Sequence, residues 1–204
     1  MSGVKRAPIA EAPQPGGRQP APGGLRLLQA FVNTHYDLRS DHGGEVLTSP
    51  DALGSWLGRH GLLDSDARVD AAGLRRALEL REGLRALAFA NNGSPPAQTD
   101  AKRALAEAAV GAIVEVRVSA DGPSFVQASR DRVEGAFGVL LAIAARAMLE
   151  GTWSRVKACP GRHCGWVFYD RSRNGTGRWC SMAVCGGRAK ARAYYERRTA
   201  RGAR

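Results

Sequence analysis

Apolar residues in the first half of the chain recur every three to four positions, which is the period of an amphipathic helix. The first such stripe begins at Leu25 and continues through Phe31 and Val32. A longer stripe covers residues 66–91 and stops at the Asn-Gly pair at 92–93, a typical helix end. The pattern therefore predicts two helices in this half, the second of them long.

Helix-start signals and further apolar periods predict three more helices. Ser49 offers a capping hydroxyl, Pro50 suits the first turn, and Asp51 faces the positive end of the helix dipole. Residues 97–110 and 130–150 also have helical periods. The stretch 41–45, which lies between the helix that begins at Leu25 and the one that begins at Ser49-Pro50, is expected to be a loop.

The period changes after residue 112. Residues 113–118 are β-branched and partly alternating, 120–123 form a turn signal, and 124–127 can return as a second strand. We therefore expect a mainly α fold with a multihelical N-terminal domain over 25–152 and one small β-hairpin. Residues 1–24 contain five prolines and five glycines and few large apolar side chains, so we expect a disordered tail there.

All four cysteines lie near the C-terminus in two matched pairs, Cys159-x4-Cys164 and Cys180-x4-Cys185. Four thiolates placed tetrahedrally match the ligand preference of Zn²⁺ and close its coordination sphere. Such a site is structural, because catalytic zinc needs an open position. His163 is expected to be a bystander. A pair of disulfides in an exported protein is the alternative.

The segment around the cysteines has the order of a treble-clef-like zinc finger. A strand is expected over 165–169, a polar turn over 171–176 and a helix over 188–198. We assign residues 153–204 to this finger, with a hairpin and a basic C-terminal helix. The zinc would replace a core that so short a segment cannot build.

The net charge of +11 is concentrated at the finger. Residues 25–158 carry equal numbers of basic and acidic side chains, whereas residues 159–204 carry eleven basic and two acidic ones. This asymmetry indicates a polyanionic partner for the finger, and a solvated, solubilising face is the alternative. There are 26 arginines and four lysines, a bias that suggests a GC-rich bacterial genome.

A short arginine-rich helix suits the major groove of DNA, while loop arginines suit phosphates. The predicted nucleic-acid contacts are therefore Arg171, Arg173, Arg178, Arg188, Lys190, Arg192, Arg197 and Arg198. Arg188 has a second interpretation, in which it pairs with Asp170 inside the finger. Trp166 and Trp179 are expected in the finger core, and Tyr195 is the better candidate for base stacking. Ala189, Ala193 and Tyr194 are expected to pack toward the finger.

No catalytic constellation and no phosphate-binding glycine motif is visible, so we do not expect an enzyme. No apolar stretch is long enough to span a membrane and no secretory signal is seen, which favours the cytoplasm. A polar cluster of His35, Asp37, Asp41 and His42 is a candidate ligand pocket, although solvated loop residues are the simpler interpretation.

The cysteine segment resembles the CGNR zinc finger family. The similarity rests on CGWVFYDRSRN (164–174), RWCSM (178–182) and CGGRAKAR (185–192), with Gly187 where the family has Asn. The body resembles the ABATE domain in FVNT (31–34), LGSWLGRHGLL (53–63) and ALELREGLRAL (77–87). The resemblance implies a bacterial, stress-induced transcription regulator with one structural zinc.

These features together predict a zinc-dependent regulator that binds duplex DNA through the finger and associates with the nucleoid. The helical body would then act as a sensor for a small-molecule effector or as a homodimerisation unit. Two alternatives use the same basic finger: an RNA-binding protein, and an adaptor that binds an acidic protein partner.

Overall fold

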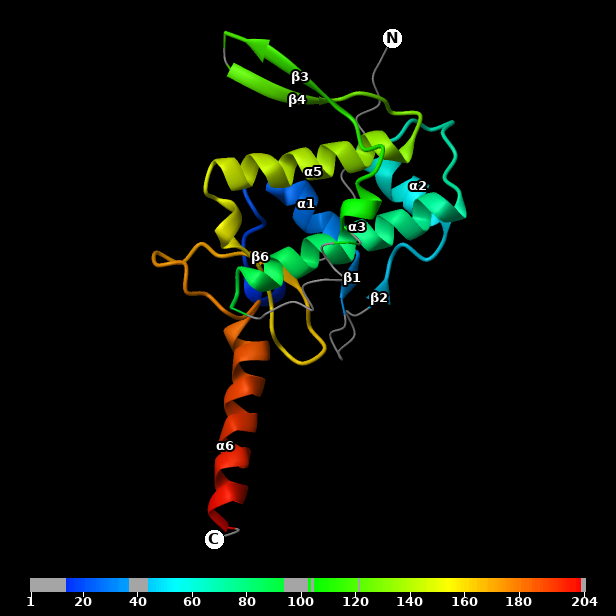
Figure 1. Ribbon diagram of the computed structural model, residues 1–204. Coiled ribbons are helices and arrows are strands. Elements are labelled where there is room, and N and C mark those ends of the chain that lie inside the picture. Colours follow the sequence, from blue (N-terminus) through cyan, green and yellow to red (C-terminus); the bar gives the residue numbers. More distant parts are fainter. Residues whose placement is uncertain (1–13, 37–43, 94–102, 104, 121, 203–204) are drawn as a thin grey trace.

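The computed structural model describes residues 14–36, 44–93, 103, 105–120 and 122–202. Helices α1 (Leu25–Val32), α2 (Pro50–Arg59), α3 (Ala71–Ala90) and α5 (Val133–Leu149) surround the main core (Figure 1). The largest fully buried side chains of this core include Phe31, Phe137, Leu28, Leu47, Leu53, Leu57, Leu80, Leu84 and Leu140. The mainly α prediction is therefore confirmed. In the described parts of the chain, no helix is long and apolar enough to cross a bilayer.

Side-chain caps determine where α2 and α3 begin. Ser49 Oγ accepts a hydrogen bond from the Ala52 amide at 3.1 Å, as the sequence predicts. Asp70 Oδ1 accepts from the Gly73 amide at 2.7 Å, so α3 begins at Ala71 rather than at residue 66. The helix expected over 97–110 lies partly outside the described residues. In its described part, residues 103 and 105–108 are helical.

The predicted hairpin consists of β3 (Val114–Ser119) and β4 (Gly122–Gln127), which pair antiparallel with Val116 opposite Phe125. It stands at the end of the molecule away from the C-terminal helix (Figure 1). A further pair, β1 (His35–Tyr36) with β2 (Gly44–Glu45), occupies part of the stretch expected to be a loop. Asp37, Asp41 and His42 of the expected polar cluster lie outside the described residues.

Two glycines in the first turns of α5 have no side chain, so the backbone of other segments can pass close to the helix there. A Cβ at Gly135 would lie 1.9 Å from the Ser129 carbonyl oxygen, and one at Gly138 would lie 2.4 Å from that of Ile113. These contacts hold the base of the hairpin against α5.

We predict that Gly135→Ala destabilises the protein by about 1–3 kcal/mol or more, because backbone must move to admit the methyl group. Gly54→Ala in α2 is the matched control, since its Cβ would meet only the Val69 side chain at 3.4 Å. That variant should be stabilised by up to about 1 kcal/mol through helix propensity. Urea denaturation of both variants checks the prediction, which is wrong if they shift stability in the same direction.

Residues 14–24, which we call the N-terminal strap, are ordered against both the body and the finger. Gln14 Oε1 accepts hydrogen bonds from Gln29 at 2.8 Å and from Trp166 Nε1 at 3.2 Å. Arg18 donates to the carbonyls of Cys180 at 2.6 Å and Trp179 at 2.9 Å. The expected disordered tail is corrected over this range, because its polar side chains find distant side-chain and backbone partners that composition does not reveal. Residues 1–13 lie outside the described chain.

The finger is clamped to the body by polar side chains. The Asn33 amide donates to the Val167 carbonyl at 2.8 Å and accepts from the Val167 amide at 2.8 Å. Arg85, which is buried, donates to the carbonyls of Val32 and His35 at 2.7 Å and to that of Gly165. Val156, Ala158 and Val167 of the finger belong to the same apolar core as the helices. The boundary expected between 152 and 153 stays a prediction.

Candidate metal centre

The first cysteine pair forms the turn of a small hairpin. Strand β5 (Val156–Ala158) leads into Cys159, and β6 (Val167–Tyr169) returns antiparallel after Cys164. The Cys159 amide donates to the Trp166 carbonyl at 2.9 Å, which closes the loop. The predicted strand at 165–169 and turn at 171–176 imply a finger hairpin between the two cysteine pairs. The structure corrects this: the hairpin flanks the first pair, and its three-residue first strand was too short to recognise.

The second pair lies at the start of the C-terminal helix. Ser181 Oγ accepts a hydrogen bond from the Val184 amide at 3.2 Å and so caps a single π-helical turn, η3 (Met182–Gly186). This turn carries Cys185 and continues into α6 (Gly187–Gly202). Any movement of the second pair is therefore passed directly to the base of α6.

The four thiols lie together as one candidate zinc site. Their sulfur atoms all lie within 4.8 Å of one another, and those of Cys164–Cys180 and Cys180–Cys185 are 3.6 Å apart. A tetrahedral zinc with Zn–S bonds of about 2.3 Å would separate its sulfurs by about 3.8 Å. The donor set thus fits one Zn²⁺ with four ligands, whose role is structural. His163 is exposed beside this group.

The close approach of the four thiols shifts the pKa values of the cysteines in opposite directions. The neighbouring thiols, that of Cys164 first, lower the pKa of the Cys159 thiol. The interaction with Cys159 instead raises the pKa of the Cys180 thiol. Four thiolates in so small a buried space repel one another, so a bound divalent cation is what allows all of them to ionise.

The aromatic residues near the cysteines are packing residues. Trp166 and Phe168 are fully buried, and Tyr36 of the body meets the Trp166 ring edge-on at 4.9 Å. Trp179 is half-buried against the second cysteine pair. Tyr195 is exposed on α6, where the sequence analysis had considered base stacking.

A buried ion pair organises the loop between the two cysteine pairs. Lys157 Nζ lies 2.8 Å from Asp170 Oδ2, and both side chains are almost completely buried. Asp170 also accepts from the amides of Ser172 at 3.0 Å and Gly177 at 2.7 Å. Burial alone would raise the pKa of Asp170, but the hydrogen bonds from Lys157 and Ser172 and the charge of Lys157 together outweigh it and lower that pKa to about 2. The expected alternative pairing of Asp170 with Arg188 is wrong, because Arg188 is exposed on α6.

Gly187, where the resemblance expects Asn, starts α6 with ordinary right-handed helical angles of −61° and −46°. A Cβ there would meet the Met182 carbonyl at 3.6 Å, a normal contact distance. The position therefore tolerates either residue without a change in the helix start.

The structure places the predicted basic contacts on two elements. The loop after β6 carries three of them: Arg171 donates to the Pro20 carbonyl at 2.8 Å, the guanidinium of Arg178 lies 5.8 Å from the Trp179 ring, and Arg173 is exposed. The remaining candidates lie on α6 and are exposed: Arg188, Lys190, Arg192, Arg197 and Arg198. The nucleic-acid contacts of these residues stay predictions.

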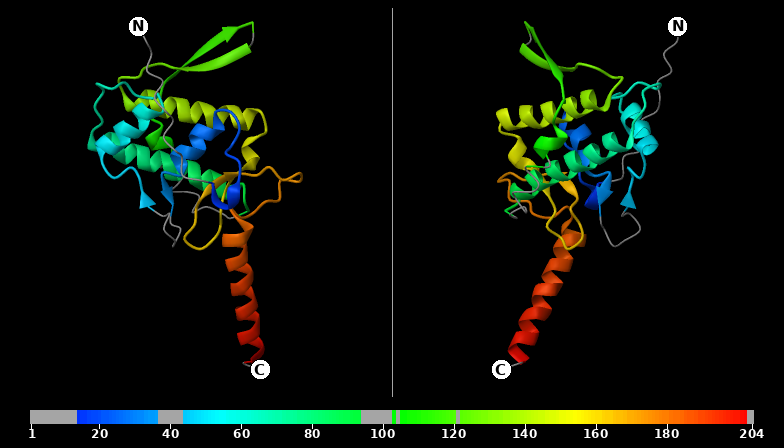
Figure 2. Two further views of the ribbon diagram at one scale, coloured as in Figure 1. Left: turned by 180° about the vertical axis from the view of Figure 1, so that it is seen from behind. Right: turned by 45° about the vertical axis from the view of Figure 1, so that its right-hand side comes forward.

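The first turn of helix α6 contacts η3, and the rest of the helix extends away from the body (Figure 2). Tyr194, expected to pack toward the finger, is 54% exposed. Only Ala189 and Ala193 are half-buried among the three residues expected there. The reason is geometric: the helix leaves the finger end-on rather than lying across it.

Two family models match the chain. A CGNR zinc finger model matches residues 155–198, and a model named ABATE, described as "Putative stress-induced transcription regulator", matches residues 25–151, more than half of the chain. Among curated proteins, none matches the sequence. Neither family description names an enzyme. The chain therefore belongs to the ABATE family and carries a CGNR zinc finger at its C-terminal end.

Proposed function

We propose that this regulator binds duplex DNA through its finger, with α6 in the major groove and the loop arginines on phosphates. The supporting observation is the state of α6, a sixteen-residue helix that projects from the molecule with charged or exposed residues on all sides. Its sequence has six basic residues and one acidic residue. A helix that is polar all round gains little from packing, so it suits a polyanionic partner.

The dimensions agree with this role. Sixteen residues form a helix about 24 Å long, and a single helix of this width enters the major groove. Arg188 and Arg192 lie near one face, whereas Lys190 and Arg197 lie near the other, with Arg198 between them. One face can therefore reach base edges while the other reaches phosphates.

The zinc in this proposal fixes the direction of α6 relative to the body, since Cys180 precedes the turn from which the helix starts and Cys185 lies within it. The domain division at 152/153 separates the DNA-binding finger from a helical body that acts as a sensor or dimerisation unit. A single finger has a small footprint, so pairing of two bodies would strengthen DNA binding. We place the protein in the cytoplasm, on the nucleoid.

Removing two arginines of α6 tests the proposal. Arg192→Ala with Arg197→Ala should weaken duplex DNA binding about tenfold or more, because two phosphate or base contacts are lost. The matched control is Arg117→Ala with Arg132→Ala, which removes the same charge from exposed positions on the body. Fluorescence anisotropy at constant salt gives both affinities. Equal affinity in the two double variants would rule out the assignment of α6, and a preference for RNA would favour the alternative partner.

A further inference from the structure

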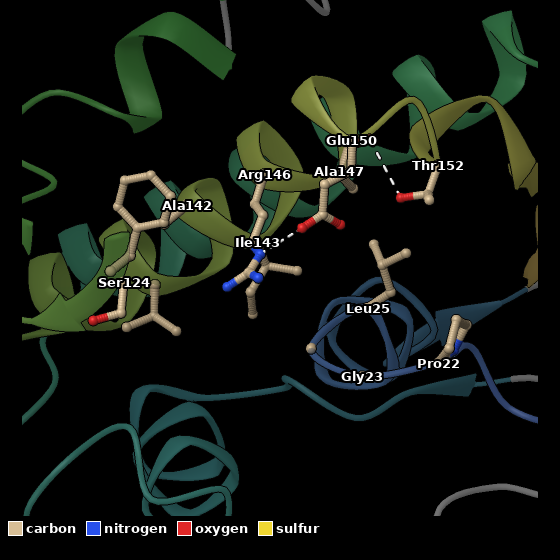
Figure 3. Close-up of a pocket in the computed structure, with 13 residues that line it drawn as sticks. Pro22, Gly23, Leu25, Ser124, Ala142, Ile143, Arg146, Ala147, Glu150 and Thr152 are labelled. Carbon is tan, nitrogen blue, oxygen red and sulfur yellow. Dashed lines mark hydrogen bonds and ion pairs between the residues drawn. The ribbon is translucent and has the colours of Figure 1, made fainter. Parts of the chain in front are cut away.

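A cavity of about 520 Å³ opens between α5, the β3–β4 hairpin and the strap where it enters α1. At the start of α5 the glycine crossings hold the base of the hairpin close to the helix. Farther along α5 the hairpin stands away, and side chains of Ile143 and Arg146 face the space (Figure 3). The volume is that of an ordinary small-molecule site, about 300–1,000 Å³.

The walls of the cavity are mainly apolar. Leu25, Phe125, Val139 and Ile143 contribute aliphatic and aromatic surface from three elements. On the hairpin, Val116 shares the face of its cross-strand neighbour Phe125 and is 60% exposed. A two-stranded hairpin with an uncovered apolar face is marginally stable alone, so an occupant that joins it to α5 would stabilise it.

The polar groups at the cavity select against charged occupants. Arg146 Nε donates to Glu150 Oε1 at 2.7 Å, as Figure 3 shows, and the two charges balance. An anion would compete with Glu150 for the guanidinium of Arg146, and a cation would compete with Arg146 for the carboxylate of Glu150. The hydroxyls of Ser124 and Thr152 donate to the carbonyls of Arg117 at 3.5 Å and Ala147 at 3.3 Å, so their oxygens can accept one or two hydrogen bonds from an uncharged group.

One wall of the cavity is connected to the finger. Pro22, Gly23 and Gly24 of the strap line the cavity, and the same strap is bound to the finger by Arg18. One of these two bonds is to the carbonyl of Cys180, which is itself a member of the second cysteine pair. A molecule that fixes the strap at Pro22 would therefore also restrain the second cysteine pair through Arg18.

We propose that this cavity binds a small, neutral, largely apolar molecule, and that its occupancy tightens the zinc finger through the N-terminal strap. Neither part depends on DNA binding. The occupant packs between Phe125 and Ile143 and fixes the strap wall. The strap then opens less often, so the second cysteine pair becomes less accessible.

The neutral fluorescent probe N-phenyl-1-naphthylamine tests the site in the zinc-loaded full chain. We expect saturable binding of about one probe per chain, the usual stoichiometry of a single pocket. Ile143→Trp, which fills the cavity, and Phe125→Ser, which removes an exposed wall, should each weaken binding about tenfold or more. Leu149→Trp and Val118→Ser are the matched controls, since Leu149 and Val118 are highly exposed and do not line the cavity.

The link to the finger is measured by the rate at which zinc passes to the chelator 4-(2-pyridylazo)resorcinol. Saturating probe should slow this transfer about threefold or more in the original protein, because ligand binding suppresses local opening. Arg18→Ala should abolish the slowing. Unsaturable binding, equal binding in Ile143→Trp and Leu149→Trp, or an unchanged transfer rate would overturn the proposal. So would sedimentation as a dimer that Ile143→Trp converts to monomer, because a second copy would then cover this face.

Discussion

Serine in place of Cys180 is expected to remove the bound zinc and unfold the finger. Structural zinc sites contribute about 10–16 kcal/mol of apparent binding free energy, as much as the whole stability of an ordinary domain. Val156 and Val167 of the finger belong to the core of the body, so the loss should spread beyond the finger. We expect zinc to fall from about one per chain to almost none, and the melting temperature to fall by about 10 °C or more.

The matched control for this prediction is His163→Asn. His163 is exposed next to Cys164 and has a φ of 61°, a conformation that Asn adopts readily. Zinc content by mass spectrometry of the native protein and melting by circular dichroism should both stay unchanged in this variant. A Cys180→Ser protein that keeps its zinc and its melting temperature would show that the four thiols do not form the metal site.

Loss of the buried carboxylate at Asp170 is expected to cost about 3–5 kcal/mol, because Asp170→Ala leaves the buried charge of Lys157 unpaired. It also leaves the amides of Ser172 and Gly177 without their acceptor. A second variant, Lys157→Met with Asp170→Asn, removes both charges and keeps an amide oxygen for the loop. It should recover at least about 1 kcal/mol relative to Asp170→Ala. Urea denaturation of the zinc-loaded proteins gives both values.

The pH dependence of this cost follows from the lowered pKa of Asp170. The carboxylate is fully ionised in the folded protein above its ordinary pKa of 3.8, so the ion pair stabilises fully there. That contribution is lost only as the pH falls toward about 2. The cost of Asp170→Ala should therefore be equal at about pH 6 and pH 8. A cost that varies between these values would mean that another group carries the effect.

The zinc centre and the helices were predictable because their signals are local. Two cysteine pairs of equal spacing identify a four-thiolate site, and the Ser49 cap with its following proline identifies the start of α2. The same holds for the hairpin β3–β4, whose β-branched residues differ from the helical periods on either side.

The features that the sequence did not reveal all depend on distant partners. Arg18 contacts carbonyls more than 160 positions away, so composition alone suggested a disordered tail. Lys157 and Asp170 meet because β5 and β6 pair, and β5 is only three residues long. Tyr194 was expected to pack on the finger, but its exposure depends on the direction in which α6 leaves η3. Only the folded arrangement supplies that direction.

The most direct measurement of the central claim is the affinity of the zinc-loaded protein for duplex DNA across a salt series. If four to six basic residues of the finger neutralise phosphates, the logarithm of affinity should fall with the logarithm of salt with a slope of roughly −3.5 to −5.5. Removal of zinc by a strong chelator should abolish the binding. Absence of binding at low salt, or binding that neither salt nor chelation affects, would contradict the account.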